Sequence, residues 1–149
     1  MRSSTVGIVV LLALVLLCAP LPAAESQQAM KLFRVGLLST AIPRSGPQFV
    51  AFEERLRELG YVEGHNVAFE FRNAEGQAER LADLAAELVR LQVDVIVAPG
   101  PEATLQAARQ ATSTIPTVML AINYDPIARG YIDGLARPGG NITGVFFLQ

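Results

Sequence analysis

Cysteine, histidine and tryptophan are nearly missing from this chain. Its 149 residues include one cysteine, one histidine and no tryptophan. The cysteine, Cys18, lies in an N-terminal segment that we expect to be removed, so the mature chain would have no disulfides and no thiol chemistry. The histidine, His65, has no cysteine or second histidine that could complete a metal site of the usual kind. We therefore expect no metal and no cofactor.

Clusters of basic residues are also missing. The chain carries 12 basic and 14 acidic side chains, which gives a net charge of −2. This balance argues against nucleic acid as a partner. Neither the Gly-x-Gly-x-x-Gly fingerprint of dinucleotide-binding proteins nor the Gly-x-x-x-x-Gly-Lys loop of ATPases occurs. The chain is therefore not expected to bind a dinucleotide or to act as an ATPase.

The N-terminus has the order of a secretory signal peptide. Arg2 supplies a positive start, Val6 to Leu17 forms an apolar run, and small residues with prolines follow. The run is about 12 residues long, whereas a membrane-spanning helix needs about 20. We expect cleavage after Ser26, with Ala24 as the other candidate. Residues 1–26 are thus predicted to be a signal peptide that exports the mature chain to the periplasm, without stable membrane insertion.

Two other interpretations of this segment remain open. The apolar run could act as an uncleaved anchor, or Cys18 could be acylated as in exported lipoproteins. Leu17 argues against acylation, because the residue before such a cysteine is normally small.

The remainder of the chain alternates between strand and helix patterns. Leu81, Leu84 and Leu88 share one face of an amphipathic helix. Residues 93–98 are apolar apart from Asp94 near the start, which suits a central parallel strand, whereas residues 66–72 alternate and suit a strand near an edge. The full prediction has strands at 33–38, 66–72, 93–98, 117–121 and 142–147, and helices at 46–59, 77–91 and 102–111, with a brief helix ending near Ala136.

This alternation predicts an α/β fold, a doubly wound parallel sheet with helices on both faces. Residues 27–149 are sufficient for one such domain. Open sheets of this class bind ligands outside the carboxyl ends of their strands. The segments expected there are 39–43, 73–74, 99–104 and 123–126, and helix starts near Gly46 and Glu102 would offer free backbone N–H groups to a small anion.

Enzymatic function is the competing interpretation. A hydrolase or related enzyme would need a nucleophile with a base, or paired carboxylates, at the ligand edge. Glu102 and Asp125 are the carboxylates expected near that edge, and no histidine joins them. Ser39 and Thr40 have no evident base. We therefore expect no catalytic residues and no enzyme.

Several segments, taken in order, resemble a family of bacterial ABC-transporter substrate-binding proteins that includes tryptophan- and tyrosine-binding members. The opening strand Phe33–Ser39 and the helix–turn–strand around Leu56–Gly64 and Asn66 carry part of the resemblance. The other matching segments are 82–89, 93–97, 108–116, Asp125-Pro126 and the run 136–144.

The resemblance implies a flavodoxin-like N-terminal lobe of a type I periplasmic binding protein, with an ABC permease and ATPase as partners. It implies a small ligand, such as an amino acid or related carboxylate, clamped between two lobes. An extracytoplasmic sensing domain of a signalling protein is the alternative function. By the same resemblance, the ligand-facing residues would be Ser39, Thr40, Gly100, Pro101, Ala103, Thr104, Asn123 and Asp125.

Two departures from the family pattern affect these expectations. Arg44 and the run Arg129-Gly130-Tyr131 stand where family members often have small residues, so ligand preference could differ. The run 136–144 is similar to the segment beside the hinge, and only five further residues follow it. We therefore expect this sequence to lack the second lobe, and a cleft with one wall would bind ligand weakly or not at all.

Overall fold

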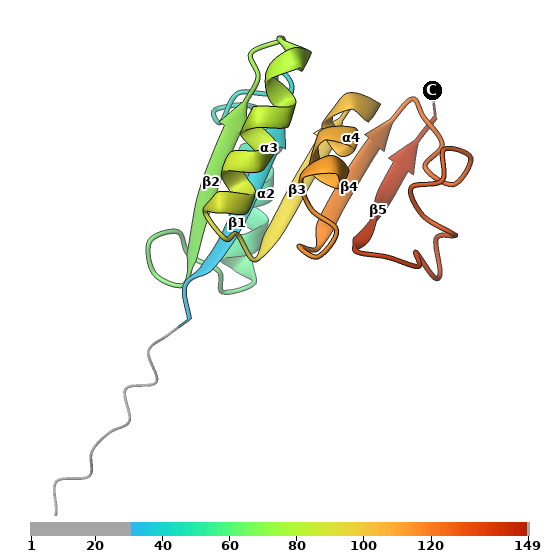
Figure 1. Ribbon diagram of the computed structural model, residues 1–149. Helices are drawn as coiled ribbons and strands as arrows, with labels where there is room; N and C mark the ends of the chain where they lie inside the picture. The colour runs from blue at the N-terminus through green and yellow to red at the C-terminus, as the bar shows by residue number, and fades with distance from the viewer. Residues whose placement is uncertain (1–30, 149) are drawn as a thin grey trace, which may run out of the picture. The chain divides into compact units, whose positions relative to one another are not determined.

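The computed structural model describes residues 31–148 of the chain (Figure 1). The signal peptide expected at residues 1–26, with its cleavage site and Cys18, lies outside the described residues. Within residues 31–148, no helix is long and apolar enough to cross a membrane.

Five parallel strands form one sheet in the order β2-β1-β3-β4-β5. This order confirms the predicted doubly wound sheet, and it is the flavodoxin-like arrangement. The continuously apolar third strand is central, and the alternating second strand lies at an edge, as their patterns predict. The strands are β1 (Phe33–Ser39), β2 (Val67–Asn73), β3 (Val95–Gly100), β4 (Thr117–Ile122) and β5 (Ile142–Phe147).

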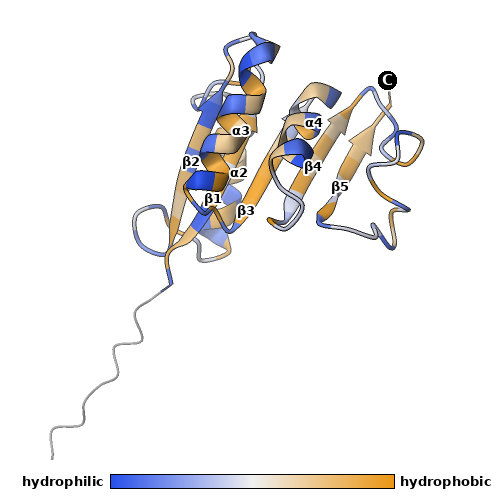
Figure 2. Cartoon of the chain, in the orientation of Figure 1, coloured by the Kyte–Doolittle hydropathy of each residue, from blue (hydrophilic) through white to orange (hydrophobic). Residues whose placement is uncertain are grey.

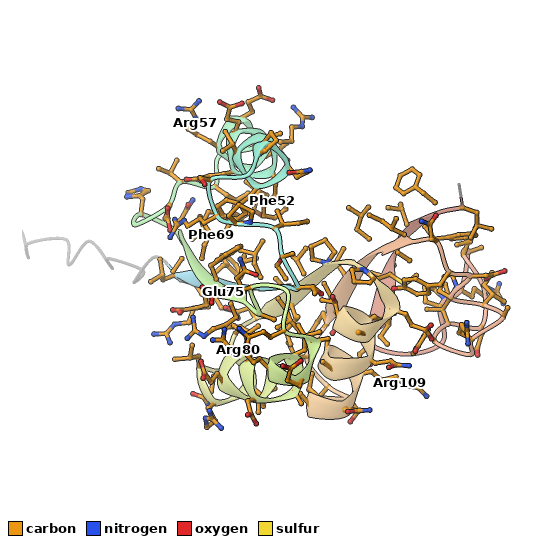
Figure 3. The ribbon with its side chains drawn as sticks, turned by 90° about the horizontal axis from the view of Figure 1, so that it is seen from above. Phe52, Arg57, Phe69, Glu75, Arg80 and Arg109 are labelled. Atoms are coloured by element: carbon orange, nitrogen blue, oxygen red, sulfur yellow. The ribbon has the colours of Figure 1, made fainter. Side chains whose placement is uncertain are left out.

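Helices cover the sheet from both sides. Figure 3 shows α2 (Pro47–Glu58) on one face and α3 (Leu81–Arg90) with α4 (Glu102–Ala111) on the opposite face. Phe52 of α2 points toward the sheet and Arg57 points away from it, as the helical spacing of apolar residues requires. The predicted helix over 77–91 is divided, because a 3₁₀ turn, η1 (Ala78–Arg80), precedes α3.

The core consists of separate clusters on the two faces. Beneath α2, Phe49 packs on Phe69 with ring centroids 5.6 Å apart, next to Val35 and Leu37. Beneath α3 and α4, fully buried side chains such as Leu88 and Ile96 meet. Each such side chain stabilises the fold by about 1.5–3 kcal/mol, so both helical layers hold the sheet in place.

The brief helix predicted before residue 136 does not form. Residues 123–141 are instead a series of turns and bends. Gly130 has a φ of +69°, outside the right-handed helical region, and the Tyr131 amide donates to the carbonyl of Pro126 at 2.9 Å. Local hydrogen bonds of this kind satisfy backbone N–H and C=O groups within turns. Ile132 is buried and packs the segment against the core. A helix prediction was wrong here because turn-forming contacts compete with a weak apolar pattern.

Candidate functional site

The carboxyl ends of β1 and β3 bring two predicted site residues together. Thr40 follows β1, and Thr104 lies in the first turn of α4, which follows β3. Their Oγ1 atoms are 2.8 Å apart and share a hydrogen bond. Thr104 is fully buried, and Thr40 is partly exposed at the edge. A hydroxyl pair of this kind can turn its remaining donor or acceptor capacity toward a ligand.

Ser39 shapes the loop that carries Thr40. Its Oγ accepts a hydrogen bond from the Ile42 amide at 2.8 Å, and the side chain is buried. The Thr40 carbonyl accepts from the Gly76 amide at 2.7 Å, which joins this loop to the loop after β2. The structure thus gives Ser39 a loop-forming contact, and Thr40 is the more accessible hydroxyl of the two.

The start of α4 provides backbone donors at the same edge. Gly100 ends β3 with a φ of +102°, a conformation that is strained for any residue with a side chain. Pro101 follows at the N-cap position of α4 and has no side-chain acceptor for the helix amides. The first-turn amides around Ala103 form the positive end of the helix dipole, and no side chain caps them. Such a helix start favours a carboxylate or another small anion.

The loop after β4 uses its polar residues to build a turn. Asn123 adopts a left-handed φ of +63°. Its backbone N–H donates to the Phe147 carbonyl at 2.9 Å, which connects the loop to the end of β5. One carboxylate oxygen of Asp125 accepts hydrogen bonds from the amides of Ile127 and Ala128, at 2.8 and 3.2 Å. Both residues lie at the expected edge, and the contacts of Asp125 are those of a turn.

Two tyrosines lie together near the start of α4, a contact that the sequence did not predict. Tyr131 donates its hydroxyl to Glu102 Oε1 at 2.8 Å, and its ring lies 6.2 Å from that of Tyr124 in an edge-to-face arrangement. Burial raises the pKa of Tyr124 to about 12, and burial followed by the Glu102 hydrogen bond raises the pKa of Tyr131. Both phenols therefore stay neutral at physiological pH. Tyr131 and Glu102 are 29 positions apart, and no spacing rule links residues so distant, so the sequence carried no signal for their hydrogen bond.

Catalytic and metal chemistry find little support at this edge. His65 lies in the turn before β2, at the amino edge of the sheet, away from Thr40 and Thr104. Across residues 31–148, no group of three or more histidine, cysteine, aspartate or glutamate side chains could hold a metal ion. The site offers hydroxyls, backbone amides and turn-forming side chains, which can hold a small solute by hydrogen bonding.

One protein family and one curated relative match the sequence of this chain. The family described as ABC transporter substrate binding protein matches residues 48–146. A tyrosine-binding protein from Clostridioides difficile (strain R20291) is 34% identical over 93 residues, which cover 62% of this chain and 26% of that protein. The chain therefore spans about a quarter of the length of this curated relative.

Solved structures show the same fold. A ligand-free, open substrate-binding protein with adhesive properties from Clostridium difficile superimposes with a TM-score of 0.69 at 25% identity, over 79% of this chain and 40% of that one. An ABC domain from Streptococcus pneumonia in complex with L-Trp superimposes with a TM-score of 0.67 at 30% identity, over 78% of this chain and 39% of that one. A conserved domain protein from Vibrio cholerae superimposes with a TM-score of 0.67 at 31% identity, over 79% of this chain and 40% of that one.

These matches confirm the family resemblance that the strand and helix segments carry in the sequence. They also assign a family of binding proteins rather than of enzymes. Each solved relative continues well beyond the region that superimposes on these five strands. With the family match extending over 48–146, the chain belongs to the ABC transporter substrate-binding protein family.

Proposed function

We propose that this chain forms the N-terminal lobe of an extracytoplasmic solute-binding component, which delivers an amino acid or related carboxylate to an ABC permease and its ATPase. Residues 1–26 would direct export to the periplasm, and residues 27–149 would form the lobe. The observation that carries the proposal is the shared hydrogen bond between Thr40 and Thr104 at the carboxyl edge. This edge is where open parallel sheets bind their ligands.

The chemistry of the edge favours a small carboxylate. The Thr40 hydroxyl and the amides at the start of α4 can donate to a carboxylate, and the helix dipole favours its charge. The tyrosine-binding and L-Trp-bound relatives make an aromatic amino acid the first ligand to test. Ser39, Gly100, Pro101, Ala103, Asn123 and Asp125 would complete the wall of the site.

Calorimetric titration of the protein from the complete reading frame with tyrosine and tryptophan tests this proposal. We expect binding, and we expect Thr40→Val to weaken it at least tenfold, since one hydrogen bond to a charged group contributes about 1.5–3 kcal/mol. The valine keeps the volume of threonine and removes the hydroxyl that faces the edge.

Thr112→Ala is the matched control, because Thr112 lies beyond the end of α4 at the opposite edge and caps a local turn. We expect it to leave the affinity unchanged. Equal affinity of the Thr40→Val and wild-type proteins would remove Thr40 from the site. Failure of the wild-type protein to bind any of the common amino acids would refute the amino-acid assignment.

A further inference from the structure

The run Arg129–Tyr131, where the chain departs from the family pattern, meets the start of α4. The Tyr131 hydroxyl donates to Glu102 Oε1 at 2.8 Å, and Arg129 Nε lies 3.7 Å from Glu102 Oε2. Two residues that depart from the pattern therefore converge on one carboxylate. That carboxylate belongs to the first residue of α4, directly before Ala103, at the carboxyl edge of the sheet.

Glu102 differs from Asp125 in what its carboxylate oxygens contact. Figure 2 shows β3, β4 and β5 as mainly hydrophobic, with hydrophilic residues on the helices and in the connecting segments, so charge at the carboxyl edge comes from loops and helix starts. Asp125 accepts hydrogen bonds from two backbone N–H groups of its own turn. Glu102 is contacted by side chains instead, and its own side chain is 25% exposed. A small solute at the edge can therefore reach this carboxylate.

The ion pair between Arg129 and Glu102 is loose. The two charged atoms are 3.7 Å apart, and the Arg129 side chain is 61% exposed. Ion pairs in contact with water contribute little to stability, because both charges are well solvated and holding a long side chain costs entropy. The hydrogen bond from Tyr131 is the shorter contact and keeps the carboxylate in place. A positively charged group of a ligand can therefore replace Arg129 with little effect on the fold.

Tyr124 adds a buried hydroxyl close to this carboxylate. The residue is 6% exposed, and within residues 31–148 its hydroxyl has no hydrogen-bond partner. Burial, followed by the nearby Tyr131 phenol and the Glu102 carboxylate, raises the pKa of Tyr124 to about 12, so this hydroxyl stays protonated beside both groups. Buried hydroxyls are normally hydrogen-bonded, because an unpaired one is costly. The cluster therefore holds a polar group available to a ligand atom that enters beside Glu102.

Together these groups suit an ammonium. An ammonium group only donates hydrogen bonds, which a carboxylate and a phenol oxygen accept, and tyrosine rings attract cations. The Arg109 guanidinium already lies 5.4 Å from the centre of the Tyr131 ring. In an α-amino acid, ammonium and carboxylate are joined to the same carbon. A ligand carboxylate held by the amides around Ala103 would therefore bring the ammonium close to Glu102, the preceding residue.

We propose that Glu102 is a specificity-determining residue that binds the α-ammonium group of the ligand, that Tyr131 is its positioning residue, and that Arg129 competes with the ligand for its carboxylate. This inference rests on the proposed function, because it requires a small carboxylate to bind at the carboxyl edge. It narrows the substrate class to zwitterionic amino acids, as opposed to carboxylic acids without an amino group. The run Arg129–Tyr131 thus adjusts ligand preference through Glu102.

Calorimetric titration of the protein from the complete reading frame tests this with matched ligand pairs. The pairs are tryptophan with indole-3-propionate, and tyrosine with 3-(4-hydroxyphenyl)propionate, which differ only in the amino group. We expect the wild-type protein to prefer the amino acid at least tenfold, and Glu102→Gln to reduce this preference below about threefold. Glu54→Gln, an exposed change on α2, is the control and should keep it.

The outcomes separate the inference from the proposed function. Equal wild-type affinity for both members of a pair would leave carboxylate binding intact and overturn the role of Glu102. An unchanged preference in Glu102→Gln, or an equal loss for both members, would overturn it as well. Binding of none of the four compounds would refute the proposed function, and the inference with it.

Two further variants test the contacts of Glu102. We expect Arg129→Ala to raise the affinity for the amino acid at least threefold and to leave the amino-free analogue unchanged, because it removes the competing cation. Tyr131→Phe keeps the ring and removes the hydroxyl, so it should narrow the preference, whereas Tyr61→Phe at the exposed amino edge should not. Unchanged or weaker amino-acid binding in Arg129→Ala, or an unchanged preference in Tyr131→Phe, would overturn these roles.

Discussion

Single residues at the amino edge hold the sheet together in a pH-dependent way. Asp94 precedes β3, and its Oδ2 accepts a hydrogen bond from the Arg34 amide of β1 at 2.8 Å, while its Oδ1 lies 2.9 Å from Lys31 Nζ. The backbone hydrogen bond from Arg34, followed by the contact with Lys31, lowers the pKa of Asp94 below its ordinary value. The charged carboxylate therefore stabilises the native state more than the unfolded chain.

We expect Asp94→Asn to lower the free energy of unfolding by about 1 kcal/mol at pH 7. Because the native pKa is lowered, this stabilisation is complete above the unfolded pKa of about 3.9 and disappears as the pH falls through the native value. Urea unfolding at pH 7 and at pH 3 would show the difference between the two proteins shrinking with acid. Glu54→Gln, an exposed change on α2, is the control, and a difference for Asp94→Asn that is the same at both pH values would contradict the assignment.

Residue types predicted the sheet edge at which these side chains gather better than the contacts that each side chain makes. The strand-end rule located Thr40 and Thr104 at one edge, and their hydrogen bond could be expected only once β1 and β3 were known to be neighbours. Asp125 could not be distinguished in sequence from a ligand-binding carboxylate, although its hydrogen bonds are those of a turn. Tyr131 and Glu102 meet through folding alone.

At the scale of elements, a glycine determines how closely β5 can approach β4. Gly144 pairs with Met119 and has a φ of +145°, and a Cβ at this position would overlap the Met119 carbonyl. Only glycine therefore fits the strand here. Substitution would force β5, and the Asn123 loop bonded to its end, away from β4.

We expect Gly144→Ala to lower the free energy of unfolding by more than about 3 kcal/mol, because it combines a backbone clash with an unfavourable φ. Gly134→Ala is the control, since a Cβ there meets no atom within 4 Å and its φ is not positive. We expect Gly134→Ala to change the free energy of unfolding by less than about 0.5 kcal/mol. Similar denaturation midpoints for the two variants would show that β5 does not pair with β4 in this register.

Strong periodic patterns predicted the elements, and weak patterns did not. The predicted spans of α4 and β5 agree with the structure, because an alanine-rich amphipathic run and an apolar run that follows two glycines leave few alternatives. The segment before residue 136 failed because Gly130 and the turn at Asp125 outweigh its few apolar residues.

At the scale of the whole molecule, the lobe is complete on one sheet face and open on the other. The α3 and α4 face is closed by two helices and by the turns around Ile132. The α2 face is closed over β1 and β2 and open over β4 and β5. Sequence patterns did not reveal this, because an apolar strand residue looks the same whether or not a helix covers it.

This asymmetry gives a stability prediction for the protein from the complete reading frame. If another part of the protein covers the exposed side chains of β4 and β5, Val145→Glu buries a carboxylate without a partner, and we expect the free energy of unfolding to fall by about 2 kcal/mol or more. Val50→Glu makes the same change on the outer face of α2, where we expect less than about 0.5 kcal/mol. Thermal and urea unfolding of both variants measure the contrast. Equal, small losses would mean that Val145 stays in water in the intact protein, because a solvated glutamate on β5 costs little more than a solvated glutamate on α2.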